Sequence, residues 1–293
     1  MIPSSGSQLW PRPERVKLAR PRIPRHLVTM AALVDFVRRH DPDRFLTALF
    51  APPDRRPALL ALYAFNHELA RAREAAREPA LALIRLQWWR EVVEGATRHH
   101  EVATPLAAAL GDGALSRDDL LALIDAREIE ADPCIATLHD WLAYLRGTAG
   151  GLAVAAARAL GAPAPEAMRD LGAAYGAAGV LRAVPALARH GRCLLPAEVL
   201  ATHALSPEAM IDAMIRTPNA PPVRAVLTTL ATTGTTLLAN APHRLPRPLI
   251  AAALPAVLAR RDLARLLHHR APRPERGIAD RLAVTLAAAR RRV

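Results

Sequence analysis

The sequence predicts an all-α protein that forms a single domain. Hydrophobic residues make up 52% of the 293 residues but aromatic residues only 4%, so the apolar side chains are mostly those of alanine and leucine. Both are strong helix formers, and runs of the β-branched residues that favour strands are scarce. The chain is long enough for one large domain with a sizeable core. The 26 prolines are compatible with helices because proline is tolerated in the first turn and between helices.

A basic tail is expected ahead of the helical part. Residues 1–29 are rich in Pro, Ser and Arg and lack hydrophobic periodicity, so we expect them to be disordered and the domain to span residues 30–293. The net charge of +12 and the pI near 11.2 would attract anions such as nucleic acid, anionic lipid or diphosphates. Much of the excess lies in the tail, for which a solvated role is the simpler interpretation, and we expect no nucleic-acid partner.

Start and stop signals place the helices of the first part of the chain. A helix that begins at residue 30 should end before Asp41, which can cap a second helix that has Pro42 at its first position. A third helix is expected over residues 57–77, and a fourth begins at Pro79. The expected core-facing residues of the fourth helix are Leu83, Leu86, Trp89, Val92 and Val93.

The same signals continue through the rest of the chain. Ser116 and Ser206 are expected helix caps. Residues 135–160 form a long helical stretch with three glycines near its middle, which permit a kink or a close helix contact. A helix over residues 166–183 should end or bend at Pro185. The other expected helices are 104–113, 117–131, 207–216, 221–239, 246–260, 260–270 and 275–291.

Motif and cysteine patterns exclude several classes of protein. The two cysteines, Cys134 and Cys193, are far apart and not in a metal-ligand spacing, which indicates a reducing compartment. The sequence contains no P-loop, no dinucleotide-binding glycine motif and no zinc spacing. Residues near the start form no apolar segment of the kind found in secretory signals. We therefore expect a cytoplasmic location, with peripheral attachment to the inner membrane as an open alternative.

Three segments together resemble the squalene/phytoene synthase family. They are Leu62-Tyr63-Ala64-Phe65, Leu86-Gln87-Trp88-Trp89-Arg90, and Leu181-Arg182 followed by Gly191-Arg192 and Leu195-Pro196. The resemblance covers most of residues 35–270 and implies an isoprenoid-synthase-like helical bundle. In that family two aspartate-rich motifs hold Mg²⁺, which neutralises the diphosphate of a prenyl donor as its C–O bond ionises.

Both motifs are altered in this sequence. The first, roughly Asp-Asp-x-x-Asp in the family, falls on residues 70–74, where Ala70 and Arg71 stand and Glu74 is the one acid kept. The second, Arg-Asp-x-x-x-Asp in the family, starts at Arg182, and Ala183 and Leu187 occupy its two aspartate positions. The Asn or Gln positions before it are Gly176 and Gly179. A magnesium site needs several carboxylates, so we predict no catalytic residues, no metal ligands and no cofactor.

The losses match one branch of the family. Leu-Arg-Ala-x-Pro at 181–185 and Ala-Phe-Asn-x-Glu-Leu-Ala at 64–70 resemble a branch that includes a mitochondrial factor needed for assembly of respiratory complex I, and its alphaproteobacterial relatives. The resemblance implies a synthase fold without synthase chemistry, with complex I subunits or assembly factors as partners and a membrane surface nearby. Two alternatives remain: a prenyl transferase that joins two prenyl diphosphates and would need Mg²⁺, and a module that binds a prenyl lipid or diphosphate without turnover.

Other charged residues have competing interpretations. Four arginines near the altered motifs either bind a phosphate without metal or form structural ion pairs; they are Arg71, Arg73, Arg182 and Arg192. Asp125, Glu128 and Asp132 lie on one helical stripe, which favours a solvated face over a relocated metal site. Residues 258–270 form a basic amphipathic pattern, typical of a helix on anionic lipid and also of an ordinary surface helix.

Overall fold

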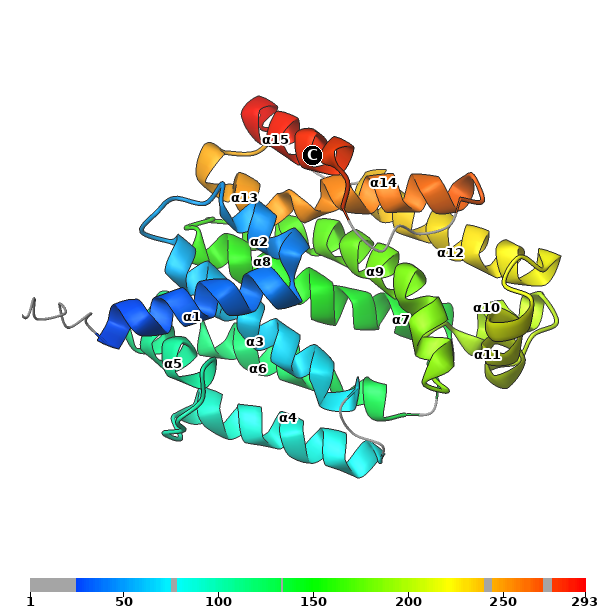
Figure 1. Cartoon of the computed structure of the whole chain (residues 1–293), viewed down its shortest axis with the longest axis horizontal. Coiled ribbons are helices and arrows are strands. Elements are labelled where there is room, and N and C mark those ends of the chain that lie inside the picture. Colours follow the sequence, from blue (N-terminus) through cyan, green and yellow to red (C-terminus); the bar gives the residue numbers. More distant parts are fainter. Residues whose placement is uncertain (1–24, 75–77, 133, 240–243, 271–275) are drawn as a thin grey trace, which may run out of the picture.

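The computed structural model describes residues 25–74, 78–132, 134–239, 244–270 and 276–293. Within them the chain forms a bundle of helices and contains no β-strand (Figure 1). The buried side chains make one continuous core. The predicted all-α class and the single helical bundle are therefore confirmed. Residues 1–24 of the predicted tail and residues 75–77, where the third helix was expected to end, lie outside the described residues.

Helix α2 begins where its capping residue predicts. Asp41 Oδ1 accepts a hydrogen bond from the backbone N of Arg44 at 3.0 Å, and Pro42 stands at the first position of α2. Helix α1 begins at Arg25, ahead of the boundary expected at residue 30. The helices of this part are α1 (Arg25–His40), α2 (Pro42–Ala48), α3 (Arg56–Glu74), α4 (Pro79–Glu94), α5 (Ala103–Gly111), α6 (Arg117–Asp125) and the short η1 (Glu128–Ala131).

The rest of the chain continues the bundle. Ser116 caps α6 and Ser206 caps α11, as predicted, each accepting a hydrogen bond from the backbone N three residues on. The remaining helices are α7 (Leu138–Leu145), η2 (Arg146–Gly150), α8 (Gly151–Ala159), η3 (Pro165–Met168), α9 (Arg169–Arg189), α10 (Ala197–Thr202), α11 (Pro207–Arg216), α12 (Pro221–Ala239), η4 (Arg247–Leu249), α13 (Ile250–Ala253), α14 (Pro255–Leu267) and α15 (Ile278–Arg290).

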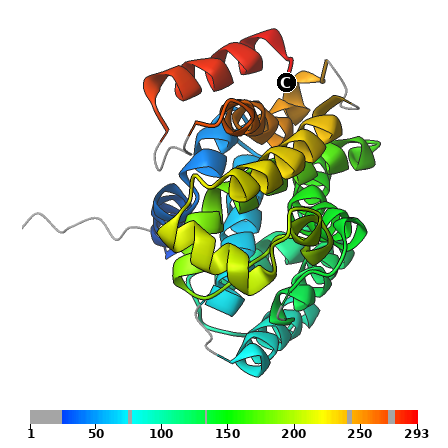
Figure 2. The ribbon, with the colours of Figure 1, turned by 90° about the vertical axis from the view of Figure 1, so that its right-hand side faces the viewer.

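Helix α9 runs through the middle of the bundle (Figure 1). It packs against α8, η2, α11, α12 and α14, whereas α3 packs against α1, α4, α5 and α8. Helix α15 forms an outer layer over α14 (Figure 2). By length and composition, one described segment, Pro165–Arg189, could cross a membrane, and 56% of its apolar window is buried within the protein. That segment contains the central helix α9, which is apolar because the helices around it cover it.

The glycine-rich stretch near the middle of residues 135–160 makes a close contact with another helix, which is one of its two expected roles. Residues Arg146–Gly150 form a π-helical turn between α7 and α8, and this turn packs on α9. A Cβ added at Gly172 of α9 would lie 2.3 Å from the carbonyl oxygen of Ala149, and one at Gly150 would lie 2.7 Å from that of Arg169. Since real side chains do not approach so closely, glycine at these positions allows the contact between the two backbones.

Two local predictions were wrong, and a third was wrong in one of its alternatives. Helix α9 does not end at Pro185 but continues to Arg189, because Val184 and Ala188 pack into the core and hold the last turns despite the missing N–H. Leu83 is 42% exposed, since the buried face of α4 runs through Ala82, Leu86 and Trp89 instead. The two helices expected over residues 246–260 and 260–270 are replaced by η4, α13 and one uninterrupted helix, α14.

The amphipathic pattern at residues 258–270 does not form a lipid-facing surface. Leu258, Leu263 and Leu266 are buried, and α14 packs against α9, α12 and α15. The apolar stripe of this helix therefore faces the protein core. The pattern at 258–270 marks a core helix with a basic outer side, and the membrane interpretation of this segment was wrong.

Candidate functional site

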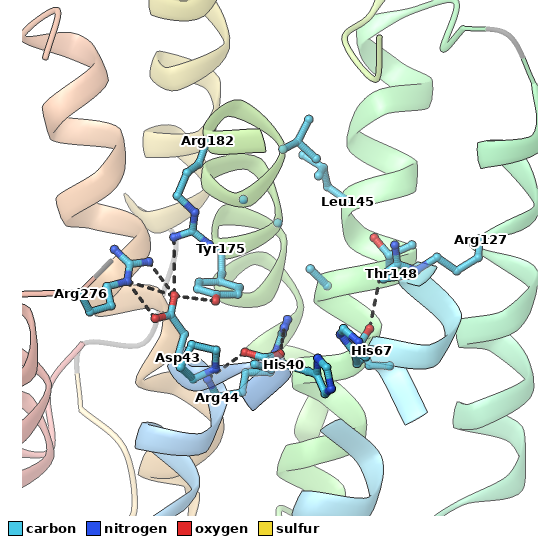
Figure 3. Close-up of a pocket in the computed structure, with 18 of the residues that line it drawn as sticks. His40, Asp43, Arg44, His67, Arg127, Leu145, Thr148, Tyr175, Arg182 and Arg276 are labelled. Atoms are coloured by element: carbon cyan, nitrogen blue, oxygen red, sulfur yellow. Dashed lines mark hydrogen bonds and ion pairs between the residues drawn. The ribbon is translucent and has the colours of Figure 1, made fainter. Parts of the chain in front are cut away.

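A cavity of about 620 Å³ lies between α3 and α9 (Figure 3). Helix α2 and the π-helical turn η2 form further walls, and residues at and just before α15 contribute at one side. The lining is rich in arginine, tyrosine and histidine. Its polar residues are His40, Asp41, Asp43, Arg44, Asn66, His67, Arg127, Tyr144, Thr148, Tyr175, Arg182, Arg276 and Arg281.

Helix α2 presents its first residues to the cavity. Because Asp41 caps the helix, its second carboxylate oxygen is free to bind Arg44 Nη1 at 2.8 Å. The Arg44 guanidinium also lies over the ring of Tyr175, with Cζ 4.8 Å from the ring centre. Burial alone would lower the pKa of Arg44, but the neighbouring charge of Asp41 outweighs it and raises that pKa. Arg44 is therefore a fixed, internally neutralised cation.

Two buried carboxylates and two arginines form a network on one wall. Arg276 binds both Asp43 and Asp262, with Nη2 of Arg276 2.7 Å from Asp43 Oδ2 and Nη1 2.7 Å from Asp262 Oδ1. Arg182 Nη1 lies 2.9 Å from Asp262 Oδ2. The hydroxyl of Tyr175 donates to Asp43 Oδ2 at 3.0 Å (Figure 3). Each carboxylate is thus held by more than one donor.

The network sets the charge state of Asp43. Its side chain is 8% exposed, and burial raises its pKa. The hydrogen bond and positive charge of Arg276, together with the charge of Arg182, outweigh burial, so the pKa of Asp43 lies below its usual value. Asp43 is therefore an ionised ion-pair partner at neutral pH, not a proton donor.

A second ion pair forms the opposite wall. Arg127 Nη1 lies 2.6 Å from Glu130 Oε1, and Glu130 is only 5% exposed. The hydroxyl of Tyr144 donates to the same oxygen at 2.7 Å, and Arg127 Nη2 donates to the amide oxygen of Asn66 at 3.3 Å. Burial, then the charge of Glu130, raises the pKa of Tyr144. The ring of Tyr144 is buried, so this tyrosine belongs to the core as well as to the cavity wall.

Two histidines stack at the edge of the cavity. The ring centres of His40 and His67 are 4.7 Å apart, and the rings are nearly parallel. Burial, followed by the charges of His40 and Arg71, lowers the pKa of His67 to about 4. His67 is therefore neutral at physiological pH.

The predicted motif residues reach the cavity only in part. Ala70 and Arg182 line it from α3 and α9, and Gly176 and Gly179 lie beside Arg182 on the same helix. A Cβ added at Gly179 would meet no atom within 4 Å, so this position opens into free space. Among the described lining residues, the other motif positions are absent: Arg71, Glu74, Ala183 and Leu187.

The four arginines proposed for anion binding do not share one site. Arg71 lines a separate surface groove, and Arg73 lines a tight pocket beside Glu130. Burial lowers the pKa of Arg192, and one of its terminal nitrogens is buried without a hydrogen-bond partner. Only Arg182 lines the large cavity, and there it forms an ion pair with Asp262. Arg182 therefore fits the alternative interpretation, that of a structural ion-pair partner.

The Trp-Arg segment of α4 also has a structural role. Arg90 Nη2 binds Asp125 Oδ1 at 2.7 Å and Glu128 Oε1 at 2.9 Å, which ties α4 to α6 and η1. Two of the three carboxylates of the predicted stripe, Asp125 and Glu128, therefore serve an exposed ion-pair network. Within the described residues no group of three or more His, Cys, Asp and Glu side chains is placed to hold a metal ion.

Sequence inspection missed most of the cavity's charged residues. Asp43, Glu130 and Arg276 follow no motif. Asp43 and Arg276 are distant in sequence, whereas Glu130 pairs with Arg127 only three residues away. Asp262 carried a signal, because it lies four residues from both Leu258 and Leu266 on the apolar face of a helix. An acid in that position needs a buried cation as partner, and Arg182 and Arg276 provide it.

The comparisons with known proteins place the chain in a family. A family model described as squalene/phytoene synthase matches residues 37–286. The chain belongs to the squalene/phytoene synthase family. Two solved structures share the fold: a dehydrosqualene synthase in complex with ligand, and the squalene synthase HpnC from Alicyclobacillus acidocaldarius. The first has a TM-score of 0.75 at 14% identity and covers 90% of this chain and 96% of that one. The second has a TM-score of 0.66 at 18% identity, with 84% and 96% covered.

The curated relatives carry the name of an assembly factor. NADH dehydrogenase (ubiquinone) complex I, assembly factor 6, of Mus musculus is 29% identical over 183 residues, and the protein of Homo sapiens is 28% identical over the same length. Each match covers 60% of this chain and 55% of the relative. The homolog of Drosophila melanogaster is 27% identical over 191 residues, with 61% and 57% covered. The match thus spans little more than half the length of these relatives.

The Mg²⁺ that the family resemblance implies does not fit the cavity's donor set. Two carboxylates line the cavity among the described residues, Asp41 and Asp43. Asp41 is held by Arg44 and Asp43 by Arg276, so both are already neutralised. Mg²⁺ requires several oxygen ligands in octahedral geometry, and arginines at the same oxygens exclude it by charge and by space. No metal-assisted step can be built from these side chains.

Proposed function

We propose that the chain is a non-catalytic member of the squalene/phytoene synthase family that supports assembly of respiratory complex I at a membrane surface. The observation that carries this proposal is the chemistry of the cavity between α3 and α9. Four of the five arginines that line it are paired with carboxylates: Arg44, Arg127, Arg182 and Arg276. An ionising prenyl diphosphate needs cations that are free to approach it, and here the acids and the arginines neutralise one another.

The assembly role is suggested by the names of the curated relatives. The curated proteins that match this chain are named as assembly factors of complex I. Their names support an assembly role for the shared part of the chain. With this role we propose a cytoplasmic location, peripheral to the inner membrane. We expect complex I subunits or other assembly factors as partners.

Deletion of the gene in its host tests the assembly role. Membranes from the deletion strain are expected to lose NADH:ubiquinone oxidoreductase activity and assembled complex I, whereas succinate oxidation is retained as the control. A wild-type copy should restore both. A copy carrying Glu74→Gln should restore them equally well, since Glu74 is the one acid kept in the first motif. Normal complex I in the deletion strain would overturn the assembly role.

A direct assay tests the absence of turnover. Purified protein is incubated with Mg²⁺ and labelled farnesyl or geranylgeranyl diphosphate, with an active squalene synthase as positive control. We expect no release of diphosphate. A squalene- or phytoene-type product would establish the prenyl transferase alternative instead.

Ligand binding without turnover is a second candidate, favoured by the size of the cavity. Its volume of about 620 Å³ falls within the range of small-molecule sites. If a prenyl diphosphate binds there, it should raise the melting temperature without Mg²⁺, and Gly179→Trp, which fills the open space beside Arg182, should abolish the rise. An unchanged melting temperature of the wild-type protein would exclude this candidate.

A further inference from the structure

Helix α15 exposes a stripe of large aliphatic side chains. Ile278 is 78% exposed, Leu282 62% and Leu286 49%. Successive helical residues turn by about 100°, so residues four apart drift by only about 40° and these three lie on one face. Scattered exposed leucines are ordinary, but three aligned along one helix form a continuous apolar ridge.

The opposite face of α15 is fixed to the protein. Val284 is fully buried, and Asp280 accepts a hydrogen bond from Arg261 Nε at 2.6 Å and one from the backbone N of Gly277 at 3.1 Å. Just ahead of the helix, Arg276 is bound to Asp43 and Asp262. These contacts hold the inner face of α15 against α14, so the ridge on the opposite face points away from the core. The helix itself lies at the outside of the bundle (Figure 2).

The exposed charged side chains that flank the ridge are all basic. The exposed charged residues of α15 and of the residues after it are Arg281, Arg290, Arg291 and Arg292. The helix contains one acid, Asp280, which is buried and paired with Arg261. On the helical wheel, Arg281 and Arg290 fall on opposite sides of the ridge. Basic flanks around an apolar stripe are the pattern of a helix that lies in a membrane interface.

A groove widens the apolar surface beside the helix. It has a volume of about 670 Å³ and runs between α15 and the region of α2 and α13. Leu49, which is 48% exposed, lines it together with alanines of α15. Arg247 and Arg291 also line the groove. The groove therefore combines apolar walls with two guanidinium groups that can bind phosphate.

Another exposed apolar surface lacks this charge pattern. Helix α4 exposes Leu81, Leu83 and Ile84. The exposed charged residues around it have mixed signs: Glu78 just before the helix and Glu94 at its end, which an anionic surface would repel, and Arg85. Helices α4 and α15 therefore differ in the charge around their exposed apolar residues, and this difference favours α15 as the helix that binds an anionic surface.

We propose that α15 and its adjoining groove dock on the surface of a bilayer that contains anionic phospholipid. Ile278, Leu282 and Leu286 enter the boundary of the acyl chains, and the arginines lie at the level of the phosphates. Lipid phosphates also reach Arg247 and Arg291 in the groove. The inference rests on the membrane location of the proposed function and identifies the surface that contacts the bilayer. Vesicle binding is measured without complex I, so membrane docking and the assembly role can fail separately.

Flotation of the full-length purified protein with vesicles tests the inference. One set of vesicles contains phosphatidylcholine alone, and the other contains phosphatidylcholine mixed with phosphatidylglycerol. The wild-type protein should float with the anionic vesicles and much less with the neutral ones. The variant Ile278→Ser/Leu282→Ser/Leu286→Ser should lose binding by on the order of tenfold or more, because each aliphatic side chain contributes to insertion. The variant Arg290→Gln/Arg292→Gln should bind the anionic vesicles less well and should become less sensitive to salt.

The matched control removes the same kind of side chain elsewhere. Leu81→Ser/Leu83→Ser/Ile84→Ser takes three exposed aliphatics from α4 and should bind the anionic vesicles as the wild-type protein does. Since all substituted residues are exposed, circular dichroism and melting should be unchanged in every variant. The proposal is overturned if the wild-type protein does not float, if it floats equally with both vesicles, or if the α15 and α4 variants lose binding to the same extent.

Discussion

Arg276 binds Asp43 across a separation of 233 residues in sequence. Its Nε lies 2.9 Å from Asp43 Oδ1 and its Nη2 2.7 Å from Oδ2, so the guanidinium grips both carboxylate oxygens. The side chains are 12% and 8% exposed. The pair joins the residue just before α15 to α2, and it therefore connects the outermost helix to the wall of the central cavity.

Removal of Arg276 should destabilise the protein strongly. Arg276→Gln leaves Asp43 and Asp262 buried beside each other with one guanidinium, that of Arg182, between them. Breaking a buried pair by removing one partner costs about 3–5 kcal/mol. We expect a loss of this size in the free energy of unfolding, measured with urea. The control is Arg38→Gln, whose exposed pair with Asp35 should change stability by less than about 1 kcal/mol. Equal small effects of both variants would contradict the role given to Arg276.

The same pair should make stability depend on acid pH. The pKa of Asp43 in the folded protein lies below the unfolded value of 3.8. The ionised form is thus favoured by folding, and its contribution is present above pH 3.8 and is lost as the pH falls through the lower, folded pKa. Asp43→Asn should therefore show a shallower fall of unfolding free energy with acidification than the wild-type protein. Urea titrations at a series of acid pH values measure this, and parallel curves would contradict it.

His67 should produce a second pH dependence, at milder acidity. Its pKa falls from 6.5 when unfolded to about 4 when folded, so the unfolded chain binds the proton first. Stability should decrease as the pH falls from about 6.5 towards about 4, since protonation then favours unfolding. His67→Gln should remove this part of the slope, while substitution of the exposed His139 by Gln should leave it in place. Unfolding midpoints over this range provide the measurement. A slope that persists in His67→Gln would refute the assignment.

Local chemistry explains the parts of the fold that the sequence predicts. Asp41, Ser116 and Ser206 begin helices because a cap depends on three or four consecutive residues. The alanine- and leucine-rich composition is sufficient for the helical class. The resemblance of short segments to a known family led to the isoprenoid-synthase-like bundle, which no periodicity could have distinguished from other bundles.

The wall of the cavity formed by Arg182 and Arg276 could not be predicted, because their ion pairs with Asp43 and Asp262 depend on the packing of segments distant in sequence. With 39 basic and 27 acidic residues, the sequence offers many possible partners for Arg276 and none is marked. Helix propensity also fails to predict a helix boundary where packing is stronger, as at Pro185, which lies inside α9. Burial of the leucines of α14 and exposure of those of α15 follow from the order in which the helices stack. Two similar basic amphipathic patterns therefore have opposite surroundings.

Two glycines of α9 should respond in opposite ways to the same substitution. A Cβ at Gly172 would lie 2.3 Å from the carbonyl oxygen of Ala149 and 2.8 Å from the Cα of Gly150, both backbone atoms that cannot turn aside. Gly172→Ala should therefore force α9 away from η2 and reduce the free energy of unfolding by about 3 kcal/mol or more. Gly179 meets nothing within 4 Å, so Gly179→Ala should stabilise the helix by up to about 1 kcal/mol.

Urea unfolding of the two single variants measures these changes. If Gly172→Ala is too unstable to purify alone, its cost can be measured in the Gly179→Ala background, since the two sites lie on the same helix but have different neighbours. Opposite signs would establish that the contact between α9 and the π-helical turn, and not helix propensity, requires glycine at position 172. Stabilisation by both substitutions would contradict the close approach of the two backbones, because an added methyl group at Gly172 could then be accommodated without displacing Ala149.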